Sequence, residues 1–264
     1  MNRIVKRVLT VGWSCFCLSI VFLLIGAESS AAQAHAQDAR ALVESAVNYL
    51  RGDTSESLVH MTIHRPDWER KMTIKAWTKG NAESIFRITS PPKDKGNGTL
   101  KKGREMWIFN PKVNRVIKLP PSMMSQSWQG SDFSNNDLAK SDTVIDDYEH
   151  KIVRTESSDG KKVYVIQSMP KTDAPVVWGM QKLKIREDFI LLAQEFYDED
   201  LQLVKVMSME KIGMMGGKLY PLQWKMAKAD VKDAYTRLDY EFIDFNKPLA
   251  DHMFTISNLK NPVR

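Results

Sequence analysis

Cysteine is scarce in this chain and is confined to one end. The two cysteines among the 264 residues, Cys15 and Cys17, both lie in an N-terminal apolar segment. Neither follows the Leu-x-Gly/Ala sequence of a lipoprotein acylation site. Without that segment the chain can form no disulfide, thiolate metal site or cysteine nucleophile. An exported form of the protein would therefore be held together by its core alone.

The sequence also lacks the patterns of nucleotide-binding and nucleic-acid-binding proteins. The sequence contains no G-x-x-x-x-G-K-[ST] phosphate-binding loop. Basic and acidic residues are interleaved, as in YEHKIVRTESSDGKK at 148–162, so no basic block of the kind that binds nucleic acid is present. We therefore expect no nucleic-acid partner and no cofactor.

Catalytic and metal-binding patterns are incomplete. The GSD run at 130–132 lacks the second glycine of the G-x-S-x-G nucleophile elbow. Ser131, with His150 and the aspartates at 146–147 as partners, still defines one alternative, a hydrolase. His60 and His64 would lie roughly 13 Å apart on a strand, too far to share one metal ion. We expect no catalytic residue, no metal and no enzymatic activity.

The N-terminus has the features of an export signal. Three basic residues precede the almost wholly apolar residues 8–25, and Ala34-His35-Ala36 fits the A-x-A cleavage pattern. We predict a signal peptide over residues 1–36, with cleavage after Ala36, or after Ala34 as second choice, and export to the periplasm. An uncleaved anchor is the alternative, because the apolar run approaches the roughly 18 residues of a membrane span. Loss of residues 1–36 removes three basic and one acidic residue, so the formal charge falls from +6 to +4.

Residues 37–264 are predicted to form one domain, mainly β with helices (α+β). The apolar period of 3.6 residues over 38–50, followed by Gly52, predicts a helix. The period then changes to two, and turns at 66–67, 110–111, 159–160, 198–200 and 216–217 separate about eleven strands. Short connections without βαβ alternation predict an antiparallel sheet.

Some strands are apolar on both faces. Trp107 and Phe109 alternate with Met106 and Ile108. A sheet with one face in water would alternate between apolar and polar residues instead. We therefore expect apolar cover on both faces over part of the sheet, more than the single long helix can provide.

Two stretches interrupt the strand pattern. Residues 91–103 are rich in glycine and lysine and are predicted to be a mobile connection. Residues 125–142 contain Ser134-Asn-Asn-Asp137, an S-x-x-D capping box that predicts a short helix over 135–139.

The chain also resembles a known family. The runs PPKDKGNGTLKKG, MWIFNPKVNRVIKLPPSMMSQSWQGSDFSNNDLAKSD, VVWGM and EFYDED occur in the order and spacing of bacterial outer-membrane lipoprotein-sorting proteins, which are related to the LolA and LolB carriers. The resemblance covers about residue 39 to the C-terminus, and residues 128–138 are its most specific part. It implies a half-open antiparallel β-barrel of about eleven strands, wrapped around an N-terminal helix and a short lid helix. Its concave apolar face would take acyl chains.

The function implied by the resemblance is that of a periplasmic carrier. It would bind lipid or lipoprotein acyl chains and hand them to an envelope partner, in lipoprotein sorting, lipid transport and outer-membrane biogenesis. We expect a monomer with an inner-membrane transporter and an outer-membrane acceptor as partners. The alternative is a non-enzymatic accessory or scaffold protein of an RND-type transporter. The cargo stays open between lipoprotein, free lipid and polyisoprenoid.

Specific residues can be assigned to this cavity. Strand alternation predicts one lipid-binding face made by Val59, Met61, Ile63, Met72, Ile74, Phe86, Ile88, Leu222, Trp224 and Met226. The predicted lid consists of Met123, Met124, Trp128, Phe133 and Leu138. Arg87 and Arg115 are candidates for the arginine that LolA carries in its cavity.

Overall fold

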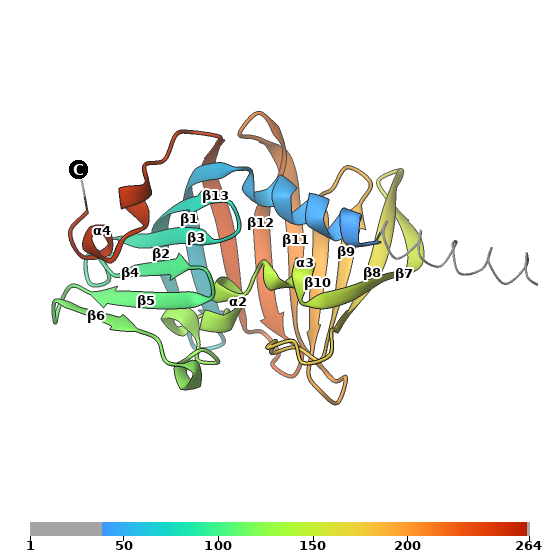
Figure 1. The fold of residues 1–264 in the computed structure, drawn as a ribbon, viewed down its shortest axis with the longest axis horizontal. Helices are drawn as coiled ribbons and strands as arrows, with labels where there is room; N and C mark the ends of the chain where they lie inside the picture. The colour runs from blue at the N-terminus through green and yellow to red at the C-terminus, as the bar shows by residue number, and fades with distance from the viewer. Residues whose placement is uncertain (1–38, 263–264) are drawn as a thin grey trace, which may run out of the picture.

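A computed structural model describes residues 39–262, and the predicted signal peptide and its cleavage site lie outside this range. The described chain forms one open sheet of thirteen strands, in which every neighbouring pair is antiparallel. In chain order the strands are β1 (Thr54–Arg65), β2 (Trp68–Lys79), β3 (Glu83–Ser90), β4 (Gly98–Lys102), β5 (Glu105–Asn110), β6 (Arg115–Lys118), β7 (Tyr148–Ser158), β8 (Lys161–Pro170), β9 (Met180–Arg186), β10 (Leu191–Tyr197), β11 (Leu203–Met215), β12 (Lys218–Lys228) and β13 (Tyr235–Phe245). Figure 1 shows the curved sheet with its helices.

The sheet consists of two meanders joined at its centre. Its order is β6-β5-β4-β3-β2-β1-β13-β12-β11-β10-β9-β8-β7, so the first and last strands of the chain pair with each other. The two edges are then β6 and β7, which are consecutive in sequence. The predicted mainly-β, half-open antiparallel fold is confirmed.

The strand count exceeds the expected eleven, partly because residues 91–103 contain strand β4. Its sequence, GTLKK, has no apolar alternation, yet four of its five residues are buried. Lys101 is fully buried and paired with Asp142 at 2.6 Å, and an added Cβ at Gly98 would lie 2.7 Å from Leu259 Cδ1. Partners distant in sequence therefore make this strand, and the predicted mobile connection is wrong over 98–102.

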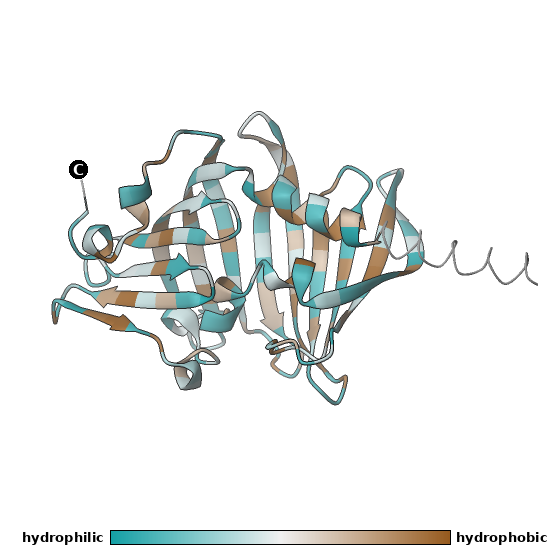
Figure 2. Ribbon diagram, viewed as in Figure 1, coloured by the Kyte–Doolittle hydropathy of each residue, from teal (hydrophilic) through white to brown (hydrophobic). Residues whose placement is uncertain are grey.

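The predicted turns all separate strands in the structure, including Asn110-Pro111 between β5 and β6 and Asp159-Gly160 between β7 and β8. Along many strands apolar and polar residues alternate as bands (Figure 2). The alternation puts one set of side chains on the concave face, where the site is found.

The connection from β6 to β7, residues 119–147, crosses between the two edges of the sheet. It contains the short helices η1 (Pro121–Met123), η2 (Trp128–Gly130), α2 (Asn135–Ala139) and α3 (Thr143–Asp146). The predicted capping box is confirmed: the Ser134 side chain accepts a hydrogen bond from the Asp137 backbone N–H, and the Asp137 carboxylate accepts one from the Ser134 backbone N–H. Helix α2 occupies the five residues predicted for it.

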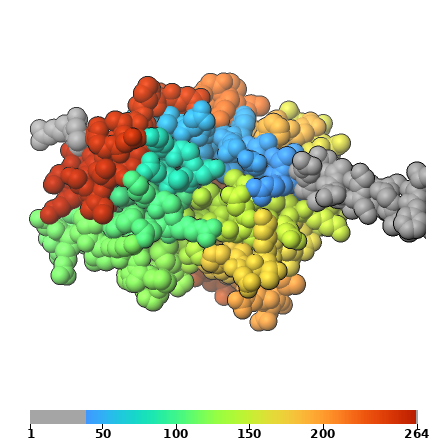
Figure 3. Space-filling view, in the orientation of Figure 1, coloured from blue at the N-terminus to red at the C-terminus, as the bar shows by residue number. Residues whose placement is uncertain are grey.

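The N-terminal helix covers the other half of the concave side. Residues 39–51 are helical, close to the predicted 38–50. Ala39, Val43 and Ala46 are buried in a core cluster with residues of β8, β9, β10 and β12. In Figure 3 this helix, helices α2 and α3, and the loop at 171–179 lie across the viewed face.

The C-terminus covers the opposite face of β3–β5. Helices η3 (Asp251–Phe254) and α4 (Ile256–Lys260) bury Phe254 and Leu259 against Phe109 and its neighbours. On the concave side Met106 packs with the 119–147 connection. The expected apolar cover on both faces of this part of the sheet is confirmed. Within residues 39–262, no helix has the length and apolar character needed to cross a membrane.

Candidate functional site

A cavity of about 320 Å³ lies between the concave face and the elements that cover it. Its wall combines strands from both meanders with α2, α3 and the loop at 171–179. Most of the lining is aliphatic or aromatic, and its exposed members are Val177, in the loop at 171–179, and Ser141, between α2 and α3. Apolar pockets of this size with a few polar groups are typical ligand sites.

The predicted lipid-binding face is divided between this cavity and the core next to it. Val59, Ile74, Phe86, Trp224 and Met226 line the cavity. Met61, Ile63, Met72 and Ile88 point to the same side of the sheet but are buried together against Trp128. Leu222 is half-buried and packs over Gly213, where an added Cβ would lie 2.6 Å from its Cδ1.

The predicted lid residues are divided in the same way. Trp128, Phe133 and Leu138 line the cavity. Met123 and Met124 pack instead with Met106, Leu119 and Ala139. These two methionines therefore pack the 119–147 connection against Met106 of β5 and do not face the cavity.

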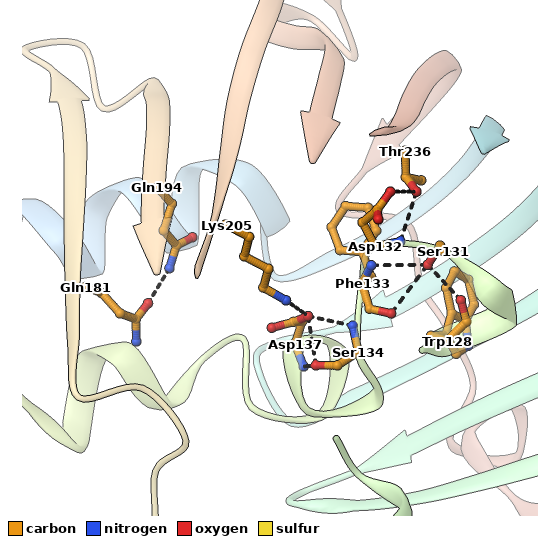
Figure 4. Close-up of polar contacts among 10 residues, drawn as sticks. All are labelled: Trp128, Ser131, Asp132, Phe133, Ser134, Asp137, Gln181, Gln194, Lys205 and Thr236. Carbon is orange, nitrogen blue, oxygen red and sulfur yellow. Dashed lines mark hydrogen bonds and ion pairs between the residues drawn. The ribbon is translucent and has the colours of Figure 1, made fainter. Parts of the chain in front are cut away.

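Buried ion pairs fix the connection in place. Arg65 donates two hydrogen bonds to the Asp132 carboxylate, at 3.0 and 3.1 Å, and Thr236 Oγ1 donates a third at 2.7 Å. Asp137 on α2 pairs with Lys205 on β11 (Figure 4), and their side chains are only 6% and 5% exposed. A segment held this way is a fixed cover, because separating either pair would leave a buried charge without a partner.

The Lys205–Asp137 pair lies beside the cavity, and Asp137 lines it. The Lys205 ammonium lies 4.9 Å from the Trp178 ring centroid and 5.3 Å from that of Phe196. Trp178, Phe196 and Asp137 all line the cavity. The Lys205 ammonium therefore contacts two covering elements: it makes a cation–π contact with Trp178 in the loop at 171–179 and an ion pair with Asp137 in α2.

Ser131 is part of a turn. Its hydroxyl donates to the Trp128 carbonyl at 2.7 Å and accepts from the Phe133 N–H at 3.2 Å (Figure 4). His150, the imagined base, lies on β7 with its Nδ1 2.8 Å from Ser168 Oγ. The geometry of the described residues therefore assembles no nucleophile–base pair at Ser131. No group of three potential metal ligands was found within 39–262 either.

The buried His150 predicts a pH-dependent stability. Burial lowers the pKa of His150, the backbone carbonyls of 144–145 oppose that effect, and the charges of Arg40 and Lys171 lower the pKa further. In the unfolded protein the imidazole has a pKa of about 6.5, so below that pH it binds a proton that the folded protein does not. The free energy of unfolding therefore falls as the pH drops below about 6.5, by at most about 1.4 kcal/mol per pH unit. Denaturant unfolding at pH 7.5 and 5.5 should show this loss in the wild type and a smaller one in His150→Asn. Equal losses in both proteins would refute the assignment.

The residues missed from the sequence are the polar ones at the cavity. Arg51, Ser55, Ser57, Thr78 and Ser141 line one part of it. Gln181 and Gln194 line another part and are joined by a 2.6 Å hydrogen bond (Figure 4). Polar residues on a strand or helix end resemble ordinary surface positions in sequence. The one feature of the sequence that could have indicated this site is Arg51, a cation directly before the glycine that ends the N-terminal helix.

The two candidate arginines lie elsewhere. Arg87 donates to the backbone carbonyls of Asn258 and Leu259 in α4, at 2.9 and 3.4 Å. Arg115 is exposed on the edge strand β6. Neither lines the cavity, so this expectation is wrong.

Several solved structures share this fold. A DUF1329 family protein from Desulfovibrio piger is 21% identical with a TM-score of 0.76, over 85% of this chain and 99% of that one. A LolA superfamily protein from Nitrosomonas europaea is 27% identical with a TM-score of 0.69, over 82% and 97%. A domain from Vibrio parahaemolyticus described as an outer membrane lipoprotein-sorting protein is 18% identical with a TM-score of 0.75, over 86% and 100%.

The comparison with protein families decides the assignment. A family model whose description reads "Uncharacterized protein" matches residues 80–261, more than half of the chain. The chain belongs to this family, and its fold is LolA-like. No curated protein matches the chain. The LolA-like resemblance seen in the sequence is thus confirmed, and the fold is that of a LolA superfamily protein.

Proposed function

We propose that this LolA-like protein is a periplasmic carrier that binds the acyl chains of a lipid or lipoprotein. The observation that carries the proposal is the largely apolar cavity of about 320 Å³ between the sheet and its covering elements. The likeness to a LolA superfamily protein and to a lipoprotein-sorting domain supports it. The protein acts by binding and release, without catalysis.

The energetics of such a site determine how cargo leaves. Each buried CH₂ contributes about 0.8 kcal/mol. An acyl chain of roughly fifteen carbons then gains on the order of 10 kcal/mol before ordering costs. Release into water would be very slow. The carrier therefore works as a monomer that docks on an inner-membrane donor and an outer-membrane acceptor.

Filling the cavity should abolish binding. Ala76 lines the cavity on β2, and Ala76→Phe would occupy space that the acyl chain needs. We expect at least tenfold weaker binding of a fluorescent fatty acid, together with loss of co-purified lipid from a solvent extract measured by mass spectrometry. The measurement uses protein prepared without detergent.

Ala227→Phe is the matched control. Ala227 is next to the lining residue Met226 on β12 and points to the other face. This variant should bind like the wild type. If both variants bind normally the cavity is not the site, and if the wild type carries no lipid and binds no probe, the scaffold alternative is favoured.

Export makes a separate prediction. The periplasmic protein should begin at Gln37, or at His35 if cleavage follows Ala34. N-terminal sequencing of protein from a periplasmic extract tests this. An intact Met1 in washed membranes would support the uncleaved anchor instead.

A further inference from the structure

One end of the cavity is polar. Ser55 and Ser57 on β1 and Thr78 on β2 line it, and Ser55 Oγ lies 2.7 Å from Thr78 Oγ1. Farther along the same strands the lining changes to Val59 and Ile74, which are paired in the register. The cavity is therefore amphipathic along the direction of β1, with small polar side chains at the end where β1 begins.

A cation without an ion pair lies at this polar end. Arg51, the last helical residue before β1, lines the cavity. Its Nη2 donates to Ser141 Oγ at 2.7 Å and its Nη1 to the Gly80 carbonyl at 3.3 Å. Within residues 39–262 its guanidinium makes no ion pair. Burial lowers the pKa of Arg51, and Asp142 opposes that effect.

The surrounding charges leave this end positive. Asp142 already accepts a 2.6 Å hydrogen bond from the fully buried Lys101. Lys140, adjacent to Ser141, also lines the cavity and donates to the Pro175 carbonyl at 2.7 Å. Asp142 thus acts on two cations, Lys101 and Arg51, whereas the charged groups that act on Lys140 are Asp147 and Arg104. Burial lowers the pKa of Lys101, the hydrogen bond and charge of Asp142 oppose that effect, and the repulsion from Arg51 adds a smaller lowering.

We infer that Arg51 binds the anionic group of an amphiphile whose acyl chain occupies the apolar part of the cavity. This inference rests on the proposed function and deepens it, because it names the class of cargo. A guanidinium offers paired N–H donors that match a carboxylate or a phosphate. The hydroxyls of Ser55, Ser57 and Thr78 can donate to the remaining oxygens.

The test compares three ligands with the same chain: hexadecanoic acid, hexadecyl phosphate and hexadecanol. Each displaces a fluorescent apolar probe from the cavity below its aggregation concentration. The wild type should bind at least one anionic ligand tenfold or more tightly than hexadecanol, and the stronger of the two distinguishes carboxylate from phosphate. Arg51→Gln should remove this preference and leave hexadecanol binding unchanged.

Three controls isolate the effect. Arg115→Gln removes the same charge from an exposed edge position and should keep the full preference. Arg51→Lys keeps the charge without the paired donors and should retain part of it, which covers the case in which Arg51→Gln fails to fold. Sodium phosphate at millimolar concentration should not raise the melting temperature, because a free anion lacks the chain; protection by phosphate alone would overturn the amphiphile assignment.

The failures are distinguishable. Equal binding of all three ligands by the wild type, or a preference that persists in Arg51→Gln, overturns this inference and leaves the carrier function intact. If the wild type binds none of the three ligands, the proposed function fails together with it.

Discussion

Replacing Lys205 with methionine is expected to lower the free energy of unfolding by about 3–5 kcal/mol. The methionine would leave the Asp137 carboxylate buried without its cation, since the two side chains are 6% and 5% exposed. The Ser134 N–H and hydroxyl would remain as its hydrogen-bond donors, at 2.6 and 2.8 Å. Those bonds cannot replace a full positive charge in an apolar wall. Denaturant unfolding of both proteins at pH 7.5 measures the difference.

A second substitution and a matched control make this result specific. Asp137→Asn in the Lys205→Met background removes the unpaired charge and keeps an oxygen for the Ser134 donors, so more than half of the lost stability should return. Lys211→Met makes the same change at an exposed position on β11 and should alter stability by less than about 0.5 kcal/mol. A Lys205→Met protein within about 1 kcal/mol of the wild type would show that the pair does not hold α2.

Local patterns predicted the local structure well. Helix α2 needs only Ser134 and Asp137, three residues apart, and the sequence contains both. The hairpins follow in the same way from alternation and turn residues. Strand β4 was missed because its stability comes from Asp142 and Leu259, which are distant in sequence. No local pattern identifies a lysine that is buried by a partner 41 residues away.

The alternation of apolar and polar residues along a strand indicates which face of the sheet a side chain is on. It does not indicate whether that side chain lines the cavity or is buried in the core. Val59 and Met61 point to the same side of β1, yet Val59 lines the cavity and Met61 is buried in the core. The difference depends on where the 119–147 connection crosses the sheet, because Trp128 covers Met61 and its neighbours. Arg51 was missed for the same reason: its place at the cavity depends on Ser141, which the same connection brings to it.

The connection itself gives the other large effect. Trp128→Ala should lower the free energy of unfolding by about 3–5 kcal/mol. The indole is 5% exposed, packs in the cluster of Met61 and Ile63, and donates through Nε1 to Thr99 Oγ1 at 3.0 Å. Trp128→Phe keeps most of the packing and should lose less, while Trp68→Ala, at a side chain that is 50% exposed, should change stability little.

This measurement separates a movable lid from a fixed cover. A lid that opens easily would tolerate Trp128→Ala with little loss of stability and would release a fluorescent fatty acid faster. A fixed cover predicts a large loss of stability, because the indole fills the core of the β1–β3 meander and not only the cavity. The buried pairs Arg65–Asp132 and Lys205–Asp137 favour the fixed cover. Cargo would then pass beside one of the two exposed lining residues, Val177 or Ser141. If the Trp128→Ala protein unfolds like the wild type but releases the probe at least tenfold faster, the segment is a movable lid and not a fixed cover.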